Sequence, residues 1–393
     1  MDAKQTIELF EKYVVPNYTR KPVVLVRGEG SYVWDSEGRR YLDLFPGWGV
    51  DGIGHCHPRV VAAVQKQAET LLHVANNWYI EPQGVLAKHI SEKSFGGQCF
   101  FCNSGAEANE AAIKLARKHS GPGKFKIITA HNSFHGRTLT TVAATAQPKY
   151  HAGFYPLPPG FIHVPFNDVD VVTKVIDAET CAIMVEPIQG EGGVNVPSDD
   201  YLPRLRQICD ECGILLIFDE VQTGCGRTGK WFGHQHWGVT PDIMTLAKAL
   251  GGGMAIGAMT AKTEIAASLT PGSHASTFGG NPMACAGGVA AFEAMEEEGL
   301  LENATRIGDT IKSRFRKLAE TCDVIVDVRG MGCMIGIELS IPGADIVARC
   351  MEQGVIINCT HDTVLRFLPS MATTEAEIAE GLDVMEKVLL EQQ

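Results

Sequence analysis

The sequence lacks any long hydrophobic run and has few cysteines and few basic residues for its length. None of its 393 residues lies in a stretch that approaches 18 consecutive apolar residues, and residues 1–20 are mixed polar, without the apolar core of a signal peptide. These absences argue against a membrane-spanning helix and against secretion. We therefore expect a soluble cytoplasmic protein without a membrane partner.

The shortage of basic side chains also limits the kind of partner. Lys and Arg number 34 against 46 Asp and Glu, which gives a formal net charge of −12. Contacts to phosphate groups need clustered Lys and Arg, so nucleic acid is not expected as a partner. The twelve cysteines are too sparse for a disulfide scaffold and fit reduced, mostly buried thiols.

Three short segments have spacings that resemble metal sites. Cys99–Cys102 is an apolar run in which residues three apart point to opposite faces of a strand, and Cys209–Cys212 ends a helical pattern. His55–Pro58 ends in a proline that suits the first turn of a helix. We therefore expect no metal at any of them.

Short apolar runs alternate with helical patterns, and no repeat or linker divides the chain. The predicted strands are Cys99–Cys102, Lys126–Thr129, Cys181–Val185, Ile214–Phe218, Ile243–Leu246 and Ala255–Thr260. Several are continuous apolar runs, which is typical of parallel strands covered on both faces. Helices are predicted at Ala106–His119 and Asp199–Glu211, the second with Ser198 as its N-cap and Gly213 past its end. The alternation predicts an α/β fold with a large, mostly parallel central sheet.

The pattern changes after about residue 290, and a chain of this length exceeds the usual size of one core. The elements predicted there are helices Glu302–Glu320 and Glu375–Leu390 and strands Val324–Val328, Cys333–Leu339, Val355–Asn358 and Val364–Leu368. They predict a smaller α+β domain, joined by N-terminal strands around Val23–Val26 and Tyr32–Trp34. We expect residues 1–50 to contribute to this small domain, 51–285 to form the large domain and 286–393 to complete the small one.

Two charged residues follow buried strands of the predicted sheet. Asp219 comes directly after Ile214–Phe218, at the strand end where open α/β sheets bind ligands. A buried carboxylate there needs a cation or several donors; a pyridinium nitrogen would suit, and a capping role is the alternative. Lys248 follows Ile243–Leu246 and precedes Gly251–Gly253. Burial could keep its amine neutral for Schiff-base chemistry, although a solvated loop lysine is the alternative.

Two further segments could bind a phosphate group. Asn103–Glu107 follows a predicted strand and opens a helix, whose first N–H groups form an anion site; Ser104 can cap the same helix. Ser276–Gly280 is a cluster of hydroxyl groups and glycines that could donate to the same phosphate.

Two motifs raise the alternative of a nucleotide-binding protein. Gly224–Lys230 matches G-x-x-x-x-G-K, but Trp231 stands where Ser or Thr should bind magnesium, and the segment follows the acidic strand instead of preceding it. Gly47–Gly52 matches G-x-G-x-x-G, but His55–Pro58 interrupts the helix that should follow. Both matches are weak.

Several long motifs together resemble those of the class III aminotransferases. They are Asn103–Glu110, Glu186–Gly193, Asp219–Gly224, Leu246–Lys248 and Ser276–Asn281. The likeness extends through nearly the whole chain, from Tyr32–Asp35 to Leu365–Pro369. It implies a fold type I enzyme that binds pyridoxal 5′-phosphate and forms a homodimer with shared active sites.

The resemblance also implies roles for the cofactor residues. Lys248 would be the Schiff-base lysine and proton carrier, and Asp219 would pair with the pyridine nitrogen and keep it protonated. The other expected contacts are Gln222 near the ring hydroxyl, Phe134 on the ring face, Ser104, Gly105 and Ala106 at the phosphate, and Thr277 reaching the phosphate from the partner subunit.

For the substrates, the resemblance implies a ping-pong transfer of a terminal amino group to 2-oxoglutarate, which leaves as glutamate. Arg137 would bind a substrate carboxylate through two hydrogen bonds. Ser276 also belongs to the expected substrate site. Arg366 would pair with Glu191 when the amine enters and turn to the carboxylate of glutamate in the other half-reaction, the alternative being a static salt bridge. A different reaction on the same cofactor, such as an aminomutase, would not need that exchange.

One residue departs from the pattern of the family. Trp48 places a bulky indole where smaller residues are expected. We expect Trp48 to line the substrate entrance with Trp78 and Tyr79. The departure leaves the choice among terminal amines open.

Overall fold

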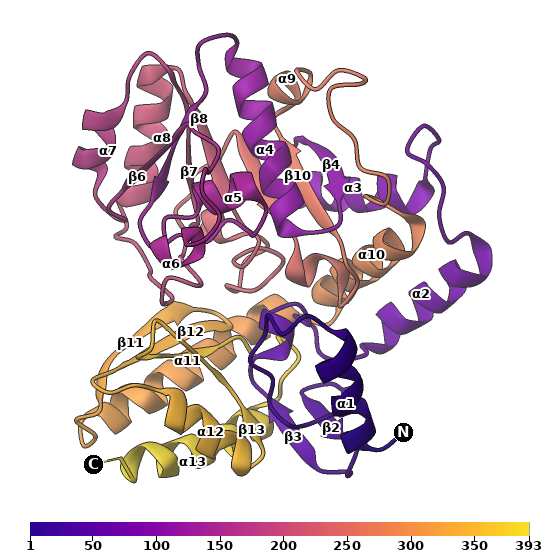
Figure 1. Ribbon diagram of the computed structural model, residues 1–393, viewed down its shortest axis with the longest axis vertical. Coiled ribbons are helices and arrows are strands. Elements are labelled where there is room, and N and C mark those ends of the chain that lie inside the picture. The colour runs from indigo at the N-terminus through magenta and orange to yellow at the C-terminus, as the bar shows by residue number, and fades with distance from the viewer. Residues whose placement is uncertain (393) are drawn as a thin grey trace.

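The computed structural model describes residues 1–392, and Figure 1 shows a large upper body above a smaller lower one. The large body contains a seven-stranded sheet in the order β4 (Gln98–Cys102), β10 (Gly257–Ala261), β9 (Ile243–Leu246), β8 (Leu215–Asp219), β7 (Thr180–Val185), β5 (Lys126–Ala130) and β6 (Phe161–Val164). Neighbouring strands from β9 to β6 are parallel, whereas β10 is antiparallel to both of its neighbours. The prediction of an α/β fold with a large, mostly parallel sheet is confirmed.

Helices cover both faces of this sheet because its central strands are apolar on both sides. Every residue of β7 and β8 is buried. Ile217 packs in the cluster formed with helix α4 (Gly105–Ser120), whereas Leu216 and Phe218 pack in the cluster with α8 (Tyr201–Cys212). Successive residues of a strand point to opposite faces, so one apolar run fills both layers. This packing on both faces fixes the positions of the carboxyl ends of the strands.

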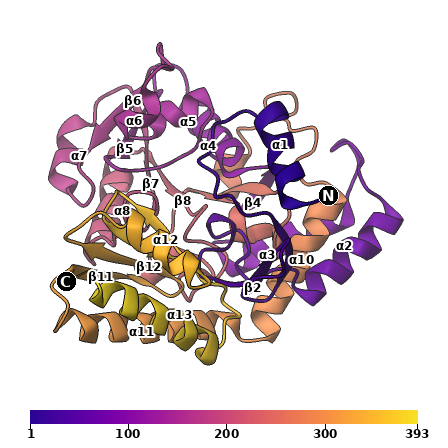
Figure 2. The same cartoon turned by 60° about the horizontal axis from the view of Figure 1, so that its bottom comes forward.

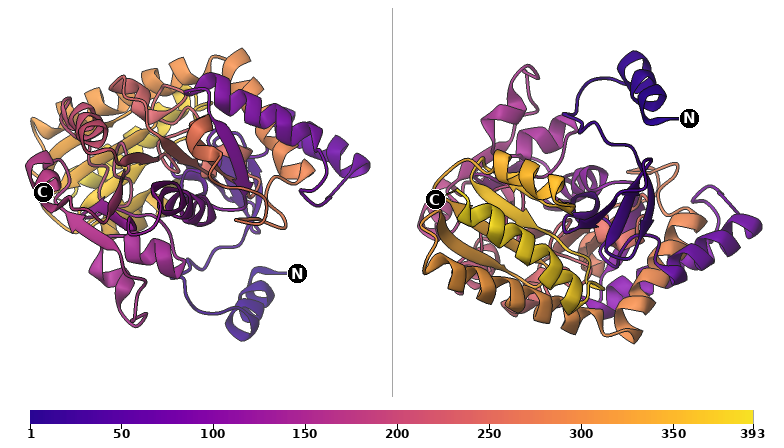
Figure 3. Two further views of the ribbon diagram at one scale, coloured as in Figure 1. Left: turned by 90° about the horizontal axis from the view of Figure 1, so that it is seen from above. Right: turned by 90° about the horizontal axis from the view of Figure 1, so that it is seen from below.

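Two smaller sheets form the lower body. One contains the antiparallel strands β11 (Ile325–Met331), β12 (Met334–Leu339), β15 (Val364–Phe367) and β14 (Asn358–Thr360), with helices α11 (Leu300–Ala319) and α13 (Glu375–Leu390) packed nearby. The other contains β1 (Leu25–Glu29), β2 (Tyr32–Asp35), β3 (Arg40–Asp43) and β13 (Val355–Ile356). Because β3 and β13 pair in parallel, strands from the two ends of the chain lie side by side, as Figure 1 labels them. Figure 2 and Figure 3 show the indigo N-terminal strands next to the orange and yellow C-terminal part.

Several helix boundaries follow from single residues. Pro58 occupies the first turn of α2 (Pro58–Thr70), as predicted. Gly213 ends α8 with φ 60°, a left-handed conformation that glycine adopts without strain, which confirms its predicted place past the helix. Helix α10 (Pro282–Glu297) begins with the Asn281 side chain accepting a hydrogen bond from the Ala284 N–H.

Two local predictions are wrong, and strands β3 and β6 were not indicated by the sequence pattern. Val355–Asn358 is not one strand, because the chain leaves one small sheet at Ile356 and enters the other at Asn358. Ser198 does not cap α8; Asp200 holds that position, and Ser198 Oγ donates to Asn167 Oδ1 at 2.8 Å. Strand β6 has no continuous apolar signal, since His163 interrupts its run.

The cysteine pattern has an ordinary structural explanation. All twelve cysteines are free, and most are buried. Cys99 and Cys102 lie on β4, paired across the sheet with Thr260 and Gly257 of β10. Among residues 1–392, no group of three or more His, Cys, Asp or Glu residues could hold a metal ion.

Neither nucleotide motif has the structural context that phosphate binding requires. Gly224–Lys230 forms turns, and only the short 3₁₀ helix η2 (Gly233–His236) follows. Arg227, within that motif, is 1% exposed and donates hydrogen bonds to the backbone oxygens of Leu368 and Gly49. Gly47–Gly52 follows β3, which belongs to a small sheet and is not followed by the helix of a dinucleotide site.

Helix α1 (Ala3–Tyr13) stands apart from the body in the view from below in Figure 3. It begins with a capping box between Asp2 and Gln5, and none of its residues is buried. Leu9, Phe10 and Tyr13 are exposed. Over the described residues 1–392, no helix has the length and hydropathy needed to cross a membrane.

Candidate active site

Asp219 ends β8 at the carboxyl edge of the large sheet, where the sequence pattern places it, and is 3% exposed. Its Oδ2 accepts a hydrogen bond from Asn109 Nδ2 at 2.8 Å and lies 2.8 Å from His135 Nδ1. Its Oδ1 accepts from the Val221 N–H at 3.1 Å. A buried carboxylate needs such donors, because burial without them is costly.

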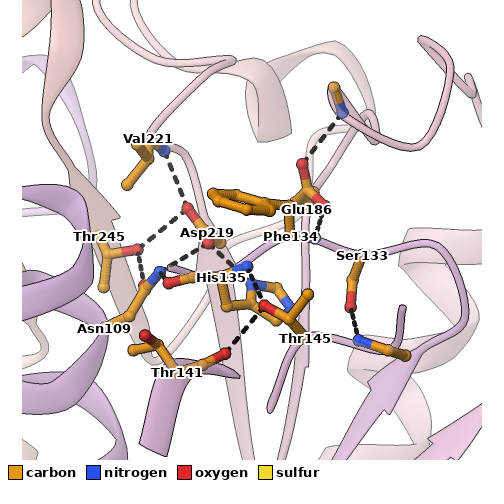
Figure 4. Close-up of polar contacts among 12 residues, drawn as sticks. Asn109, Ser133, Phe134, His135, Thr141, Thr145, Glu186, Asp219, Val221 and Thr245 are labelled. Carbon is orange, nitrogen blue, oxygen red and sulfur yellow. Dashed lines mark hydrogen bonds and ion pairs between the residues drawn. The ribbon is translucent and has the colours of Figure 1, made fainter. Parts of the chain in front are cut away.

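A second set of contacts fixes the groups that surround Asp219, as Figure 4 shows. Asn109 Nδ2 also donates to the His135 backbone oxygen at 2.7 Å, and Thr245 Oγ1 donates to Asn109 Oδ1 at 2.7 Å. The His135 N–H donates to Thr145 Oγ1 at 2.8 Å. The side chain of Asn109 and the backbone of His135 are therefore each held by further partners.

Glu186 is another buried carboxyl group at this edge and directly follows β7. Its two oxygens accept hydrogen bonds from the N–H groups of Phe134 and Gly190, each at 3.0 Å. Burial raises the pKa of Glu186 to about 7; the charge of Asp219 also raises it, whereas His135 and the two N–H groups lower it. Glu186 therefore titrates near neutral pH.

This titration predicts a pH-dependent stability for the protein without ligand. The folded pKa of about 7 lies above the ordinary value of 4.5, so the stabilisation from Glu186 is fully present below pH 4.5 and is lost as the pH rises through 7. The shift corresponds to a loss of about 3 kcal/mol in the free energy of unfolding. Urea unfolding of wild type and Glu186→Gln from pH 4.5 to 8 should show the difference between them changing by that amount, and a constant difference would contradict the assignment.

Lys248 lies just past β9 and opens the short 3₁₀ helix η3 (Lys248–Gly251). Its φ of 47° lies in the left-handed region, which is uncommon for a residue other than glycine, and such strained positions cluster at active sites. Burial lowers the pKa of Lys248, the charge of Glu191 opposes this shift, and Arg366 adds to it. A lowered pKa increases the share of neutral, nucleophilic amine.

The turn before α4 provides a site for an anion. Ser104 is the N-cap, and its side chain accepts a hydrogen bond from the Glu107 N–H at 3.2 Å. The N–H groups of Gly105 and Ala106 are the first of the helix, so they have no acceptor within it. A Cβ on Gly105 would approach Val221 to 2.8 Å, so glycine lets the loop after Asp219 pack against the turn. The positive end of the helix and these N–H groups suit a phosphate.

These groups line one cavity of about 470 Å³. The sequence-predicted residues that line it are Ser104, Gly105, Ala106, Phe134, Arg137, Asp219, Gln222 and Lys248. Ser276 and Thr277 do not line it; Ser276 Oγ instead accepts from Asn103 Nδ2 at 3.2 Å. One chain therefore does not bring Thr277 to the rest of the predicted site.

Glu191 and Arg366 form an ion pair beside the cavity, in which Arg366 is buried and Glu191 is partly exposed. Arg366, on β15, is 1% exposed, and its Nη1 donates to Glu191 Oε1 at 2.7 Å. Its Nη2 donates to Asn358 Oδ1 at 3.0 Å, and its Nη1 lies 3.4 Å from Gln222 Oε1. Burial would raise the pKa of Glu191, but Arg366 and Lys248 hold it below its usual value. Gln222 lines the cavity and so connects the pair to it.

The aromatic residues expected at the substrate entrance are not gathered at the cavity. Trp48 is 51% exposed, has a φ of 57° and lies with its ring centroid 6.2 Å from that of Tyr18. Trp78 and Tyr79 are 67% and 108% exposed. None of the three lines the cavity, although Val50, two residues after Trp48, does.

The sequence profile described as aminotransferase class-III matches residues 13–389. The chain belongs to the class III aminotransferases. An acetylornithine aminotransferase from Methanocaldococcus jannaschii is 51% identical over 395 residues, covering 100% of this chain and 99% of that protein. One from Caldanaerobacter subterraneus is 51% identical over 386 residues, covering 97% and 98%. The resemblance drawn from the motifs is confirmed.

Solved structures of this family share the fold. The ornithine aminotransferase of Toxoplasma gondii superposes with a TM-score of 0.96 at 35% identity, covering 100% of this chain and 96% of that one. The acetylornithine aminotransferase of Elizabethkingia anophelis gives a TM-score of 0.90 at 37% identity, covering 99% of both chains. The predicted fold type I is confirmed.

As a class III aminotransferase, the chain uses pyridoxal phosphate, and the cavity fits that cofactor. Among residues 1–392, Asp219 pairs with no Lys or Arg; its partners are Asn109, His135 and the Val221 N–H, and such a carboxylate suits a protonated pyridine nitrogen. The free N–H groups of Gly105 and Ala106 suit the phosphate, and the amine of Lys248 suits the aldehyde. The ring nitrogen, the phosphate and the aldehyde of the cofactor thus each have a chemical counterpart on the cavity wall.

Sequence reasoning missed the residues that hold Asp219 and Phe134 in place. Asn109 lies one helical turn after Gly105, on the same face of α4. The helical spacing could therefore have predicted that its side chain lies on the side of the phosphate turn. His135 follows Phe134 directly, and Glu186 follows an apolar strand as Asp219 does. No local signal identifies Thr245, which lies within β9.

Proposed function

We propose that this class III aminotransferase moves the δ-amino group of N2-acetylornithine to 2-oxoglutarate in arginine biosynthesis. The products are N-acetylglutamate semialdehyde and glutamate. The observation that carries the proposal is the Glu191–Arg366 pair beside a cavity that also presents Arg137. Relatives named acetylornithine aminotransferase, among them those of Methanocaldococcus jannaschii and Aquifex aeolicus, are 51% and 46% identical and support it.

In this proposal, the cofactor residues act as follows. Pyridoxal phosphate, when bound, supplies an aldehyde that accepts the amino group and a ring that accepts electrons. Asp219 would hold the ring nitrogen protonated, and the amine of Lys248 would bind the aldehyde carbon and, once released, take the proton from the amine-bearing carbon of the substrate. The remaining contacts are Ser104, Gly105 and Ala106 at the phosphate, Phe134 on the ring face and Gln222 near the ring hydroxyl.

The Glu191–Arg366 pair would let one pocket accept two different substrates. Acetylornithine brings an uncharged chain to this region, so Arg366 needs Glu191 as its partner. Glutamate and 2-oxoglutarate bring a second carboxylate, which Arg366 can bind if Glu191 moves away. Because an unpaired buried charge is costly, a movable partner keeps Arg366 paired in both half-reactions. Arg137 would bind the carboxylate that all these substrates share.

We also propose a cytoplasmic homodimer with two shared active sites. The loops around Asn76 and Ser276 are adjacent, since Asn76 Nδ2 donates to the Ser276 backbone oxygen at 3.1 Å. Large apolar side chains exposed on these loops are Leu71, Leu72, Trp78, Tyr79 and Phe278. Burial of such a patch against a second copy would also bring Thr277 and Ser276 to the partner's cavity. Twelve free cysteines suit a reducing compartment.

Within each subunit, we propose the division 1–50, 51–285 and 286–393. The pairing of β3 with β13 supports assigning residues 1–50 to the small domain. The large sheet lies wholly within the second range.

The choice among terminal amines, which the sequence left open, defines the test of this proposal. A comparison of kcat/KM for acetylornithine, ornithine, succinylornithine and 4-aminobutyrate tests the proposal. Acetylornithine should give the highest value, and a higher value for any other amine would replace it as the substrate. Isomerisation of an amine without 2-oxoglutarate would instead identify an aminomutase.

Removal of Arg137 should weaken both half-reactions. Arg137→Ala loses a bidentate, charge-assisted contact, so kcat/KM for acetylornithine and for glutamate should each fall roughly a hundredfold. The amount of bound cofactor, measured by absorbance after release in alkali, should stay near that of wild type. An equal loss of cofactor would show that Arg137 supports the cofactor and not the substrate.

A further inference from the structure

The two arginines of the proposed substrate site have different surroundings. Arg366 donates to the oxygens of Glu191 and Asn358. The guanidinium of Arg137 is exposed and forms no hydrogen bond or ion pair with any other residue in the range 1–392. Its close neighbours are aromatic: its central carbon lies 4.0 Å from the ring centroid of Tyr150 and 5.3 Å from that of Phe134.

The backbone of Tyr150 is tied to neighbouring residues, and its ring packs against that of Phe134. It lies in the short helix α6 (Pro148–His151), and its N–H donates to the Gln147 backbone oxygen at 3.0 Å. Gln147 Nε2 donates in turn to the backbone oxygen of Ser133 at 3.0 Å. The rings of Tyr150 and Phe134 meet edge to face, with centroids 5.6 Å apart and planes at 83°. Tyr150 itself does not line the cavity, so it can act on a substrate only through its neighbours.

We infer that Tyr150 is a positioning residue. By orienting Arg137, it determines the preference of the enzyme for amines that also carry a carboxylate. The ring face attracts the guanidinium of Arg137 without using any of its N–H donors. An acidic partner would occupy those donors and would have to be displaced by each substrate. The aromatic platform therefore keeps Arg137 oriented and its planar fork free for a bidentate carboxylate. This inference rests on the proposed carboxylate contact of Arg137.

Removal of the Tyr150 ring is expected to cause a modest change in substrate preference. A cation over an aromatic ring at an exposed site changes binding by roughly three- to fivefold. The change should appear with substrates that have the carboxylate and vanish with substrates that lack it. Lys149 provides a matched control, because its Nζ lies 5.0 Å from the same ring but the residue does not line the cavity.

The test compares acetylornithine with N-acetylputrescine, which is the same amine without the carboxylate, in single half-reactions of the holoenzyme. Tyr150→Leu should lower the ratio of the two kcat/KM values about three- to fivefold by its effect on acetylornithine alone. Tyr150→Phe and Tyr150→Trp, which keep a ring face, and Lys149→Met should leave the ratio unchanged. In an Arg137→Ala background, Tyr150→Leu should have no further effect on the ratio.

Two results would overturn the inference. One is an equal loss for both amines in Tyr150→Leu, which would indicate a structural role. The other is an unchanged ratio in that variant when its cofactor content and Tm match wild type. If wild type itself shows no preference for the carboxylated amine, the proposed role of Arg137 is wrong, and so is the inference about Tyr150. If acetylornithine is inert but another carboxylated amine reacts, only the proposed substrate fails, and the same ratio is then measured with that amine and its decarboxylated form.

Discussion

Replacing Lys248 with alanine should lower kcat for amino-group transfer by at least about 10⁴-fold. The variant loses both the amine that would bind the cofactor and the base that would move the substrate proton, and a positioned base alone contributes up to about 10⁴-fold. No other lysine lines the cavity formed by the described residues, so none can replace it. Steady-state transfer to 2-oxoglutarate measures the loss.

A chemical readout separates this role from a general loss of structure. Borohydride reduction of the wild-type holoenzyme should attach the cofactor to the peptide that contains Lys248, as mass spectrometry would show. Lys262→Ala is the matched control, since Lys262 follows another strand of the sheet but pairs with Asp242 at 2.7 Å. Attachment to a different lysine, or an active Lys248→Ala variant, would refute the assignment.

Asp219→Asn should reduce kcat/KM for acetylornithine roughly 10³-fold. The substitution preserves size but removes the charge that would hold the ring nitrogen protonated, and loss of one partner of a buried ion pair costs about 3–5 kcal/mol. The positions of Asn109 and His135 suit a carboxylate, so the new amide would also place an N–H group among donors. Single half-reactions followed by cofactor absorbance measure the effect on chemistry.

Thr245→Val is expected to have a smaller effect than Asp219→Asn and serves as its comparison. Thr245→Val removes the hydroxyl that donates to Asn109 Oδ1 and so acts on Asp219 only through its partner. Loss of one such hydrogen bond is worth about 1 kcal/mol, or about fivefold in rate. The two variants should therefore differ by about two orders of magnitude. An Asp219→Asn enzyme within tenfold of wild type would show that the charge is not needed.

The central sheet was predictable because its strands are short apolar runs buried on both faces. Lys248 and Asp219 could be identified as the residues that follow two of these runs, and the motifs around them indicated the family. The packing between the ends of the chain was harder to predict. A run such as Val355–Asn358 carries no signal for the point where it passes from one sheet to another, because the apolar residues continue through Ile357, past the end of β13 at Ile356.

The network around Asp219 could not be predicted for a different reason. Asn109 and His135 precede Asp219 by 110 and 84 positions, and the order of strands in the sheet decides whether such residues meet. Periodicity gives the direction of a side chain but not the element that it faces. The aromatic neighbours of Arg137 lie closer in the sequence, with Phe134 three and Tyr150 thirteen positions away, but helix α6 is too short to produce a periodic signal.

The pairing of β3 with β13 has a consequence for synthesis on the ribosome. The strands of the large sheet are encoded together, between Gln98 and Ala261, so this body can form as soon as they have emerged. Strand β3 emerges early but cannot complete its ladder until Val355 has been translated. Its open edge must therefore wait through most of translation, exposed to pairing with other nascent chains. The small sheet that contains β3 can therefore be completed only after most of the chain has been translated.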